Sequence, residues 1–350
     1  MMKSWRLAWV VCLGIVVVGA MSGFMVWKVL AQFAVDREPG PPDAAGPISK
    51  GARMVPFAAD RGPAPLVAIP FDGERAMKYL RDICAIGPRI SGSDGMAKQQ
   101  ELLRKHFEAH GAQVEFQRFT AQQKSQPRPV EMANLIISWH PERQRRVIIC
   151  CHYDTRPMAD EELDRRKWHL PFVSANDGGS GVAFMMELAH VMKDIPTTVG
   201  VDFVIFDGEE YIFERNRDKY FFGSEHFARV YKQKRPHPTY LAAVLLDMIA
   251  GKNPKFPIEQ HSGTQAGALV AELWGIAREL NCTAFQNRWG PAVLDDHLAL
   301  NKAGIPAVDI IDFDYPHWHR LSDTPENCSP EGMTQVAKVL TTWLQRIPKQ

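Results

Sequence analysis

The chain has 350 residues, of which 45% are hydrophobic and 23% charged, a composition typical of a folded globular protein. Its 41 basic and 40 acidic side chains give a formal net charge of +1, so the overall charge favours neither nucleic acid nor anionic lipid as a partner. Six cysteines are too few for a disulfide scaffold, and no CxxC pair indicates a structural zinc site. We therefore expect a folded domain and no nucleic-acid partner.

Residues 1–31 are predicted to anchor the chain in a membrane. Residues 7–27 carry no charged side chain, and at about 1.5 Å per residue a helix of this length crosses a hydrocarbon layer ~30 Å thick. Lys3 and Arg6 precede this run, which favours a cytoplasmic N-terminus and places the remaining chain in a periplasm or secretory lumen. A cleaved signal peptide is the alternative, and it would make the protein secreted.

Residues 32–70 are rich in Pro, Gly and Ala and show no sustained period, which predicts a stalk. From residue 71 to residue 350, helical and strand patterns alternate, which predicts one α/β domain with a largely parallel or mixed sheet. In chain order we expect helices over 71–86 and 96–110, strands over 113–119, 133–139 and 147–151, a helix over 181–192, a strand over 201–206, a helix over 224–231, a strand over 241–246, a helix over 264–280, a strand over 307–311 and a helix over 332–346.

Polar side chains follow several of the strands that are predicted to be buried. In an open α/β sheet, ligands bind beyond the carboxyl ends of the strands, where residues distant in sequence meet. We therefore expect one pocket to be lined by residues at these strand ends and in the loop before the 181–192 helix: His152, Asp154, Asp177, Asp207, Glu209, Glu210 and Asp247.

The residue types in this group, together with His319, indicate a metal centre. Carboxylates mixed with imidazole suit Zn²⁺, which catalytic sites commonly hold through three protein ligands, and the absence of HExxH means that loops would assemble the site. Taken singly, Asp177 before two glycines is equally typical of a turn. Glu209 and Glu210 are harder to explain that way, because adjacent buried carboxylates repel each other unless a cation or a proton intervenes.

Five segments carry a resemblance to a known family. The motifs RISGSDG at 89–95, CHYD at 151–154, NDGGSG at 176–181, FDGEE at 206–210 and the late His319 resemble the co-catalytic zinc aminopeptidase superfamily. Within it, the sequence is most similar to the glutaminyl cyclases, because of LLDMI at 245–249, NPKF at 253–256, LDDH at 294–297 and Trp318, with Asp323 downstream. The resemblance spans residues 72–346.

This resemblance implies a fold, a cofactor and a reaction. The fold would be a mixed, mostly parallel central sheet flanked by helices, and the reaction would convert the N-terminal glutamine of peptides or proteins to pyroglutamate with release of ammonia, an acyl transfer. One zinc ion would be held by Asp177, Glu210 and His319. The implied acid–base residue is Glu209, the substrate pocket is formed by Asp247, Asp295 and Trp318, and His152 and Asp154 would lie at a second metal position or behind the first.

The sequence departs from this family at two places. Val182 stands where animal members often have the second cysteine of a disulfide, so we expect Cys150 and Cys151 to be core residues without a bridge. The tryptophan that members carry shortly after the second glutamate is missing from 211–217, and Phe213 or Tyr315 would replace it.

The acidic residues of the site also lead to a prediction from charge alone. Six carboxyl groups would surround one divalent ion: those of Asp177, Glu209, Glu210, Asp247, Asp295 and Asp296. They cannot all ionise without a large cost, so we expect Glu209, Asp247 and Asp295 to share protons and to have raised pKa values.

Two other functions use the same residues. A two-zinc aminopeptidase would hold one ion with His152, Asp177 and Asp247 and a second with Asp177, Glu210 and His319, while Glu209 activates a bridging water. A binding ectodomain that has lost catalysis would be expected to lose ligands, and none is lost. The ligand set does not decide between one zinc and two, so the preference for a cyclase rests on residues 295–297 and Trp318. The sequence does not indicate the oligomeric state.

Overall fold

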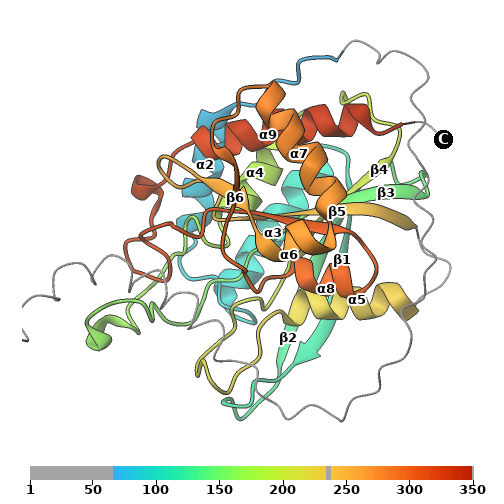
Figure 1. Ribbon diagram of the computed structural model, residues 1–350. Coiled ribbons are helices and arrows are strands. Elements are labelled where there is room, and N and C mark those ends of the chain that lie inside the picture. Colours follow the sequence, from blue (N-terminus) through green and yellow to red (C-terminus); the bar gives the residue numbers. More distant parts are fainter. Residues whose placement is uncertain (1–65, 234–237, 349–350) are drawn as a thin grey trace, which may run out of the picture. The chain divides into compact units, whose positions relative to one another are not determined.

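The computed structural model describes residues 66–233 and 238–348, which contain a six-stranded sheet with helices on both faces (Figure 1). The strand order is β1-β2-β4-β3-β5-β8, in which β1, β2 and β4 pair antiparallel and β4, β3, β5 and β8 pair parallel. The predicted mixed, mostly parallel sheet is confirmed. Its strands are β1 (Gln113–Ala121), β2 (Val130–Trp139), β3 (Arg145–His152), β4 (Gly200–Phe206), β5 (Thr239–Asp247) and β8 (Ala307–Ile311).

Strand β3 shows why the sheet needs helices on both sides. Successive side chains of a strand point to opposite faces. Ile149 and Cys151 of β3 join one hydrophobic cluster, whereas Ile148 and Cys150 join another, and all four are buried. The first cluster includes α2 (Gly73–Cys84), α3 (Asp94–Ala109), α4 (Ser180–Leu188), α7 (Gly267–Glu279) and α9 (Glu331–Arg346), and the second includes α5 (Phe222–Gln233) and α8 (His297–Lys302).

Most predicted helices begin and end within a few residues of the observed ones, because their caps are local. Asp72 accepts a hydrogen bond from the backbone N–H of Arg75 at the start of α2, and Ser93 does the same for Met96 at the start of α3. The predicted helix over 264–280 is confirmed from Gly267 to Glu279 as α7, but its start differs, because residues 264 and 265 belong to a separate helix, α6 (Gln260–Gln265). Ala266 is the C-cap of α6 and the N-cap of α7, with non-helical dihedrals, and Gly267 follows it directly.

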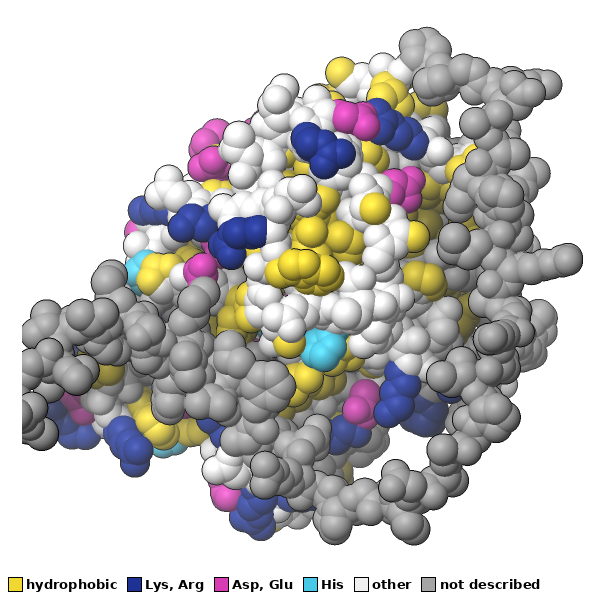
Figure 2. Space-filling model, in the orientation of Figure 1, with side chains coloured by type: hydrophobic (Ala, Val, Ile, Leu, Met, Phe, Trp, Pro, Cys, Tyr) yellow, Lys and Arg dark blue, Asp and Glu magenta, His cyan; other side chains and the backbone are white. Residues whose placement is uncertain are grey.

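Two short strands, β6 (Phe256–Ile258) and β7 (Phe285–Trp289), pair in parallel as a separate small sheet that the sequence did not predict. A strand of three residues with a central proline is too short to show alternation. Single 3₁₀ turns occur at Arg165–Lys167 and Pro325–Asn327. On the face in Figure 2, basic and acidic side chains of the described residues are interspersed, in keeping with the net charge of +1.

The predicted anchor and most of the predicted stalk lie outside the described residues. Within the residues that the structure describes, no helix is long and apolar enough to cross a bilayer. The end of the stalk segment contacts α9, where the side-chain amide of Gln345 accepts from the backbone N–H of Val67 and donates to its carbonyl. Cys150 and Cys151 are buried and free, as expected for core residues.

Candidate active site

The predicted polar residues meet at the carboxyl ends of the parallel strands. His152 is the last residue of β3, Asp247 is the last residue of β5, and Glu209 and Glu210 follow β4. Asp177 lies in the loop before α4, and His319 lies in the loop after β8. The sequence argument that brought these residues to one edge of the sheet is therefore confirmed.

Asp177 stands between two imidazoles. Its Oδ1 atom lies 3.1 Å from Nε2 of His152, and its Oδ2 atom lies 3.4 Å from Nε2 of His319. Nε2 of His319 also contacts Oε1 of Glu210, and Nε2 of His152 lies 3.5 Å from Oδ1 of Asp247. The geometry thus contains two half-sites that share Asp177, one with Glu210 and His319 and one with His152 and Asp247.

The site has the properties of a cation-binding centre. Ligand atoms of His152, Asp177 and Glu210 all lie within 4.8 Å of one another, and all three side chains are buried. Oδ2 of Asp177, Oε2 of Glu210 and Oδ1 of Asp247 have no hydrogen-bond partner among the described residues. Because a buried carboxylate oxygen without a partner is costly, and several lie together here, a divalent cation fits this donor set.

The pKa shifts of Glu210 and His319 are consistent with an excess of negative charge in the site. Burial raises the pKa of Glu210, and the nearby carboxylate of Asp177 raises it further. Burial alone would lower the pKa of His319, but the charge of Glu210 and bonds to other carboxylates hold it well above its ordinary value. Both shifts are those expected of ligands packed together for a positive ion.

Asp154 lies behind the two glutamates. Its two carboxylate oxygens accept hydrogen bonds from the backbone N–H groups of Glu209, at 3.1 Å, and Glu210, at 3.0 Å. With both oxygens engaged in this way, Asp154 fixes the loop after β4. Of the two places that the sequence left open for Asp154, the geometry favours the one behind the candidate ligands.

Asp323 holds the Asp177 loop in the same manner. Its carboxylate accepts from the backbone N–H groups of Asn176, at 2.9 Å, and Asp177, at 3.2 Å. It also accepts from the hydroxyl of Tyr315 at 2.9 Å, and the Tyr315 side chain is buried. The structure therefore connects Tyr315 to the support of a candidate ligand, while its predicted part in the substrate pocket stays a prediction.

Two backbone positions show how closely these loops approach the sheet. Gly178 has a φ of +77°, and a Cβ atom there would lie 2.8 Å from the carbonyl oxygen of Asp154 and 2.9 Å from Cε1 of His152. Only glycine allows this approach. His319 has a φ of 53°, a left-handed conformation that a non-glycine residue adopts at a cost, and such positions cluster at functional sites.

A second group of carboxyls lies beside the cation-binding set. Glu209 and Asp295 are buried and Asp247 is largely buried, with 12% of its side chain exposed, and loss of hydration is the largest cause that raises the pKa of each. The charge of Glu210 adds to the shift of Glu209, and that of Asp247 adds to the shift of Asp295. The predicted rise in these pKa values is confirmed in direction, and the sharing of protons among the three stays a prediction.

Aromatic side chains surround part of the site. The indole of Trp318 stacks on the imidazole of His319, with ring centroids 3.9 Å apart, and Phe313 lies 5.3 Å from Trp318. Phe213 is half-buried and packs against Tyr211 at 4.9 Å. Trp318 is thus placed against a candidate ligand, whereas a role for Phe213 in the pocket stays a prediction.

Sequence reasoning missed the residues that support His319. Nδ1 of His319 lies 3.4 Å from Oδ1 of Asp160, and both oxygens of Asp160 accept from the buried guanidinium of Arg156 at 2.9 Å. Asp160 also accepts from Arg215 at 2.7 Å. Arg156, Asp160 and Arg215 lie in loops, do not end a strand and belong to none of the motifs found in the sequence. The spacing of Arg156 and Asp160 by four residues was the only local signal.

Comparisons with known proteins agree with this arrangement. Residues 134–344 match the model of peptidase family M28. The structure of a glutaminyl cyclase from Fimbriiglobus ruber is 52% identical, with a TM-score of 0.80, over 83% of this chain and 100% of that one. The chain belongs to peptidase family M28.

Other proteins similar to this chain include a cyclase and a peptidase. The structure of a leucine aminopeptidase precursor from Bacteroides thetaiotaomicron is 28% identical, with a TM-score of 0.75, over 81% of this chain and 100% of that one. A glutaminyl-peptide cyclotransferase from Bothrops jararaca is 26% identical over 249 residues, which are 61% of this chain and 64% of that protein. This M28 chain therefore spans just under two thirds of the length of that curated relative.

Proposed function

We propose that this protein is a glutaminyl-peptide cyclotransferase, an enzyme that converts an N-terminal glutamine to pyroglutamate and releases ammonia. The observation that carries the proposal is its likeness to the Fimbriiglobus ruber glutaminyl cyclase, which is 52% identical over its whole length. The largely buried group of Glu209, Asp247 and Asp295 beside the cation-binding residues supports it, because this reaction moves protons without needing a water nucleophile.

We propose further that one zinc ion is held by Asp177, Glu210 and His319, the half-site in which an imidazole and two carboxylates meet. When bound, zinc would act as a Lewis acid that polarises the γ-carboxamide of the substrate glutamine. Asp154 and Asp323 keep the ligand loops in place through their bonds to backbone N–H groups.

Glu209 would move the protons of the reaction. The α-amine of the substrate attacks its own γ-carboxamide carbon, and Glu209 takes the proton that the amine loses. The C–N bond of the amide then breaks, and Glu209 returns that proton to the departing nitrogen, which leaves as ammonia. Because nucleophile and electrophile belong to one molecule, the site chiefly has to hold a cyclic geometry.

Asp247 and Asp295 would orient the α-amine, and Trp318 would form a wall of the pocket. An amine is a hydrogen-bond donor, and the carboxyls of Asp247 and Asp295 accept such bonds in a buried site. The indole of Trp318 stacks on His319 and so stands next to the position where the carboxamide would lie. The substrates would be peptides or proteins whose first residue is glutamine.

The alternative function is a two-zinc aminopeptidase. It is favoured by one observation, the second half-site in which Nε2 of His152 lies 3.1 Å from Asp177 and 3.5 Å from Asp247. In that enzyme both half-sites would hold an ion and Glu209 would activate water. In the cyclase His152 and Asp247 would instead serve the substrate side of the site.

One experiment separates the two functions. Release of ammonia from a glutaminyl peptide is measured beside hydrolysis of a leucyl arylamide, on protein whose zinc content has been counted. The expected result is cyclisation by protein with one zinc ion in the active site. Asp177→Asn protein should contain one zinc ion fewer than wild type, which assigns that ion to the active site. Hydrolysis with two zinc ions lost in that variant would overturn the proposal.

We also propose that residues 1–31 anchor the chain in a membrane and that residues 32–70 form a stalk, which would place the catalytic domain outside the cytoplasm. The uncharged run at 7–27 after Lys3 and Arg6 supports this placement. Fractionation of membranes, with protease protection of the domain, tests it.

A further inference from the structure

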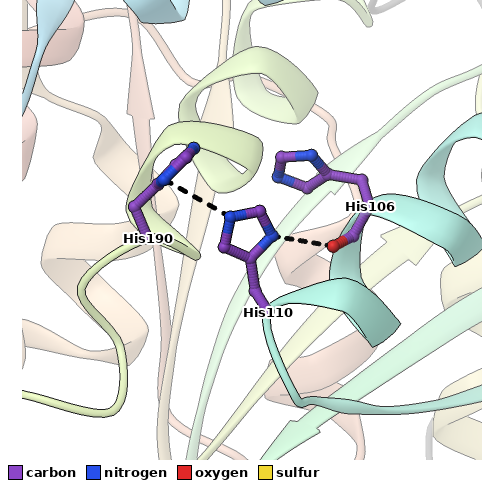
Figure 3. Close-up of side chains that lie close together, drawn as sticks. All are labelled: His106, His110 and His190. Atoms are coloured by element: carbon purple, nitrogen blue, oxygen red, sulfur yellow. Dashed lines mark hydrogen bonds between the residues drawn. The ribbon is translucent and has the colours of Figure 1, made fainter.

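Three histidines outside the active site lie together at the ends of two helices (Figure 3). His106 and His110 are one turn apart near the end of α3, and His190 follows α4. All three are half-buried, and one ring nitrogen of each lies within 4.8 Å of the other two. Among the described residues, only the active-site group of His152, Asp177 and Glu210 has comparable spacing.

The His106–His110–His190 triad is separate from the active site. Helix α4 begins at Ser180, next to the Asp177 loop, and ends at Leu188, next to His190. Because a helix rises about 1.5 Å per residue, the length of α4 alone puts the triad on the order of 12 Å or more away from Asp177. A ligand of the triad would therefore not be a ligand of the catalytic site.

The outer nitrogens of two of these rings are held by oxygen atoms. Nδ1 of His110 lies 2.8 Å from the backbone carbonyl of His106, and a carbonyl only accepts, so Nδ1 carries the proton and Nε2 has a free lone pair. Nε2 of His190 lies 2.7 Å from the hydroxyl of Tyr79. Hydrogen bonds of this kind to the outer nitrogen are what orients imidazole ligands in metal sites.

The inner nitrogens face each other at the separation of two ligands on one ion. Nε2 of His110 lies 3.3 Å from Nδ1 of His190 (Figure 3). Two nitrogens bound to a tetrahedral zinc at ~2.0–2.1 Å are about 3.3 Å apart. A usual hydrogen bond is shorter, at ~2.7–3.2 Å. The two nitrogens form a long hydrogen bond in the metal-free protein, and the same spacing fits two ligands of one ion.

Metal binding requires a lone pair on the nitrogen that faces the ion, and therefore neutral imidazole. Because the carbonyl of Met186 only accepts, Nε2 of His106 carries a proton in the metal-free protein. This proton moves to Nδ1 when Nε2 binds an ion.

We propose that His106, His110 and His190 form a second metal site, for a divalent transition-metal ion that prefers imidazole ligands. His110 and His190 supply the two facing nitrogens. His106 supplies the third, exchanging its 2.8 Å bond to the carbonyl of Met186, in the last turn of α4, for the ion. Water takes the fourth position. An ion held there links the end of α3 to the end of α4 and stabilises the domain.

The test uses Zn²⁺ as the probe on the whole chain and on His110→Gln, with His169→Gln as the matched control, since His169 is exposed and outside the triad. After removal of metal, zinc per chain is counted by equilibrium dialysis, and thermal unfolding is followed with and without zinc. Wild type and His169→Gln should bind one more ion than His110→Gln. The zinc-dependent rise in Tm should persist in Asp177→Asn protein, because binding to the native state stabilises it.

Equal zinc content in wild type and His110→Gln would overturn the proposal. A second variant, Tyr79→Phe, guards against a folding defect because it keeps all three imidazoles and removes only the oxygen behind His190. It should weaken zinc binding at the triad by about 10- to 100-fold. Unchanged affinity in both Tyr79→Phe and His190→Gln would equally contradict the site.

Discussion

Asp160 lies behind His319, with Oδ1 of the carboxylate 3.4 Å from Nδ1 of the imidazole, while Nε2 of the same ring contacts Glu210. Burial alone would raise the pKa of Asp160, but the charge of Arg156 and the bonds from His319 and Arg215 hold it well below the ordinary value. Asp160 is therefore ionised. A carboxylate in this position fixes the ring and directs the lone pair of Nε2 toward the metal.

Asp160→Asn should therefore weaken zinc binding at the active site by about 10- to 100-fold and lower kcat. The measurement is competition for zinc with a chelator of known affinity, on protein whose circular dichroism matches wild type. Asp164→Asn, at an exposed ion pair with Arg166, is the control and should change neither quantity. Wild-type affinity in Asp160→Asn would show that Asp160 does not position His319.

Glu209→Gln and His319→Ala separate proton transfer from metal binding. Glu209→Gln should abolish turnover while zinc content stays at the wild-type level, because the amide cannot take up the proton of the amine. His319→Ala should lose zinc as well as activity. Activity assays paired with elemental analysis decide this, with Glu214→Gln, an exposed glutamate, as the control. Loss of zinc in Glu209→Gln would assign that residue to the ligands instead.

The rate of cyclisation should rise with pH through a group that titrates above the ordinary carboxylate range of ~4.3. Burial and then the charge of Glu210 raise the pKa of Glu209, and only its ionised form takes up a proton. Activity is therefore lost as pH falls through this raised pKa and is retained above it. A profile of kcat/KM measures this, and an acidic limb at ordinary carboxylate values would count against Glu209 as the base.

Asp154→Asn should lower kcat and reduce the free energy of unfolding by about 1–3 kcal/mol. The carboxylate accepts from the backbone N–H groups of both Glu209 and Glu210, whereas asparagine has one oxygen and can serve only one of them well. A misplacement of the base by a fraction of an ångström is expected to reduce the rate by about 10²-fold. Steady-state kinetics beside a denaturation curve measure both effects, and unchanged kinetics would refute this support.

Arg146→Ala should cost about 3–5 kcal/mol of stability, because it leaves the buried carboxylate of Asp202 without its partner. Nε of Arg146 lies 2.8 Å from Oδ2 of Asp202, and both residues are almost inaccessible to solvent. The free energy of unfolding in urea measures the loss. Arg166→Ala removes an exposed ion pair and should change it by less than about 1 kcal/mol. A loss in Arg146→Ala as small as that of the control would contradict the assignment.

The sequence by itself determined the class of fold and the edge of the sheet at which the site lies. The apolar run at 147–151 predicted a strand buried on both faces, and β3 is such a strand. His152 and Asp247 follow apolar runs directly, and Glu209 and Glu210 follow another run after two intervening residues, so their place at the carboxyl ends could be predicted from local pattern. A strand that is buried on both faces consists of consecutive apolar residues, so the sequence shows it as an unbroken apolar run.

Only the tertiary structure decided which polar groups in different loops meet. The contacts of Asp160 with His319 and of Asp323 with the Asp177 loop each depend on the packing of irregular segments, which carry no period. The break between α6 and α7 and the meeting of the three histidines of the triad likewise depend on how helices pack on the sheet. Such contacts join residues far apart in the chain, 147 positions in the case of Asn176 and Asp323, and no local pattern records a pairing over that distance.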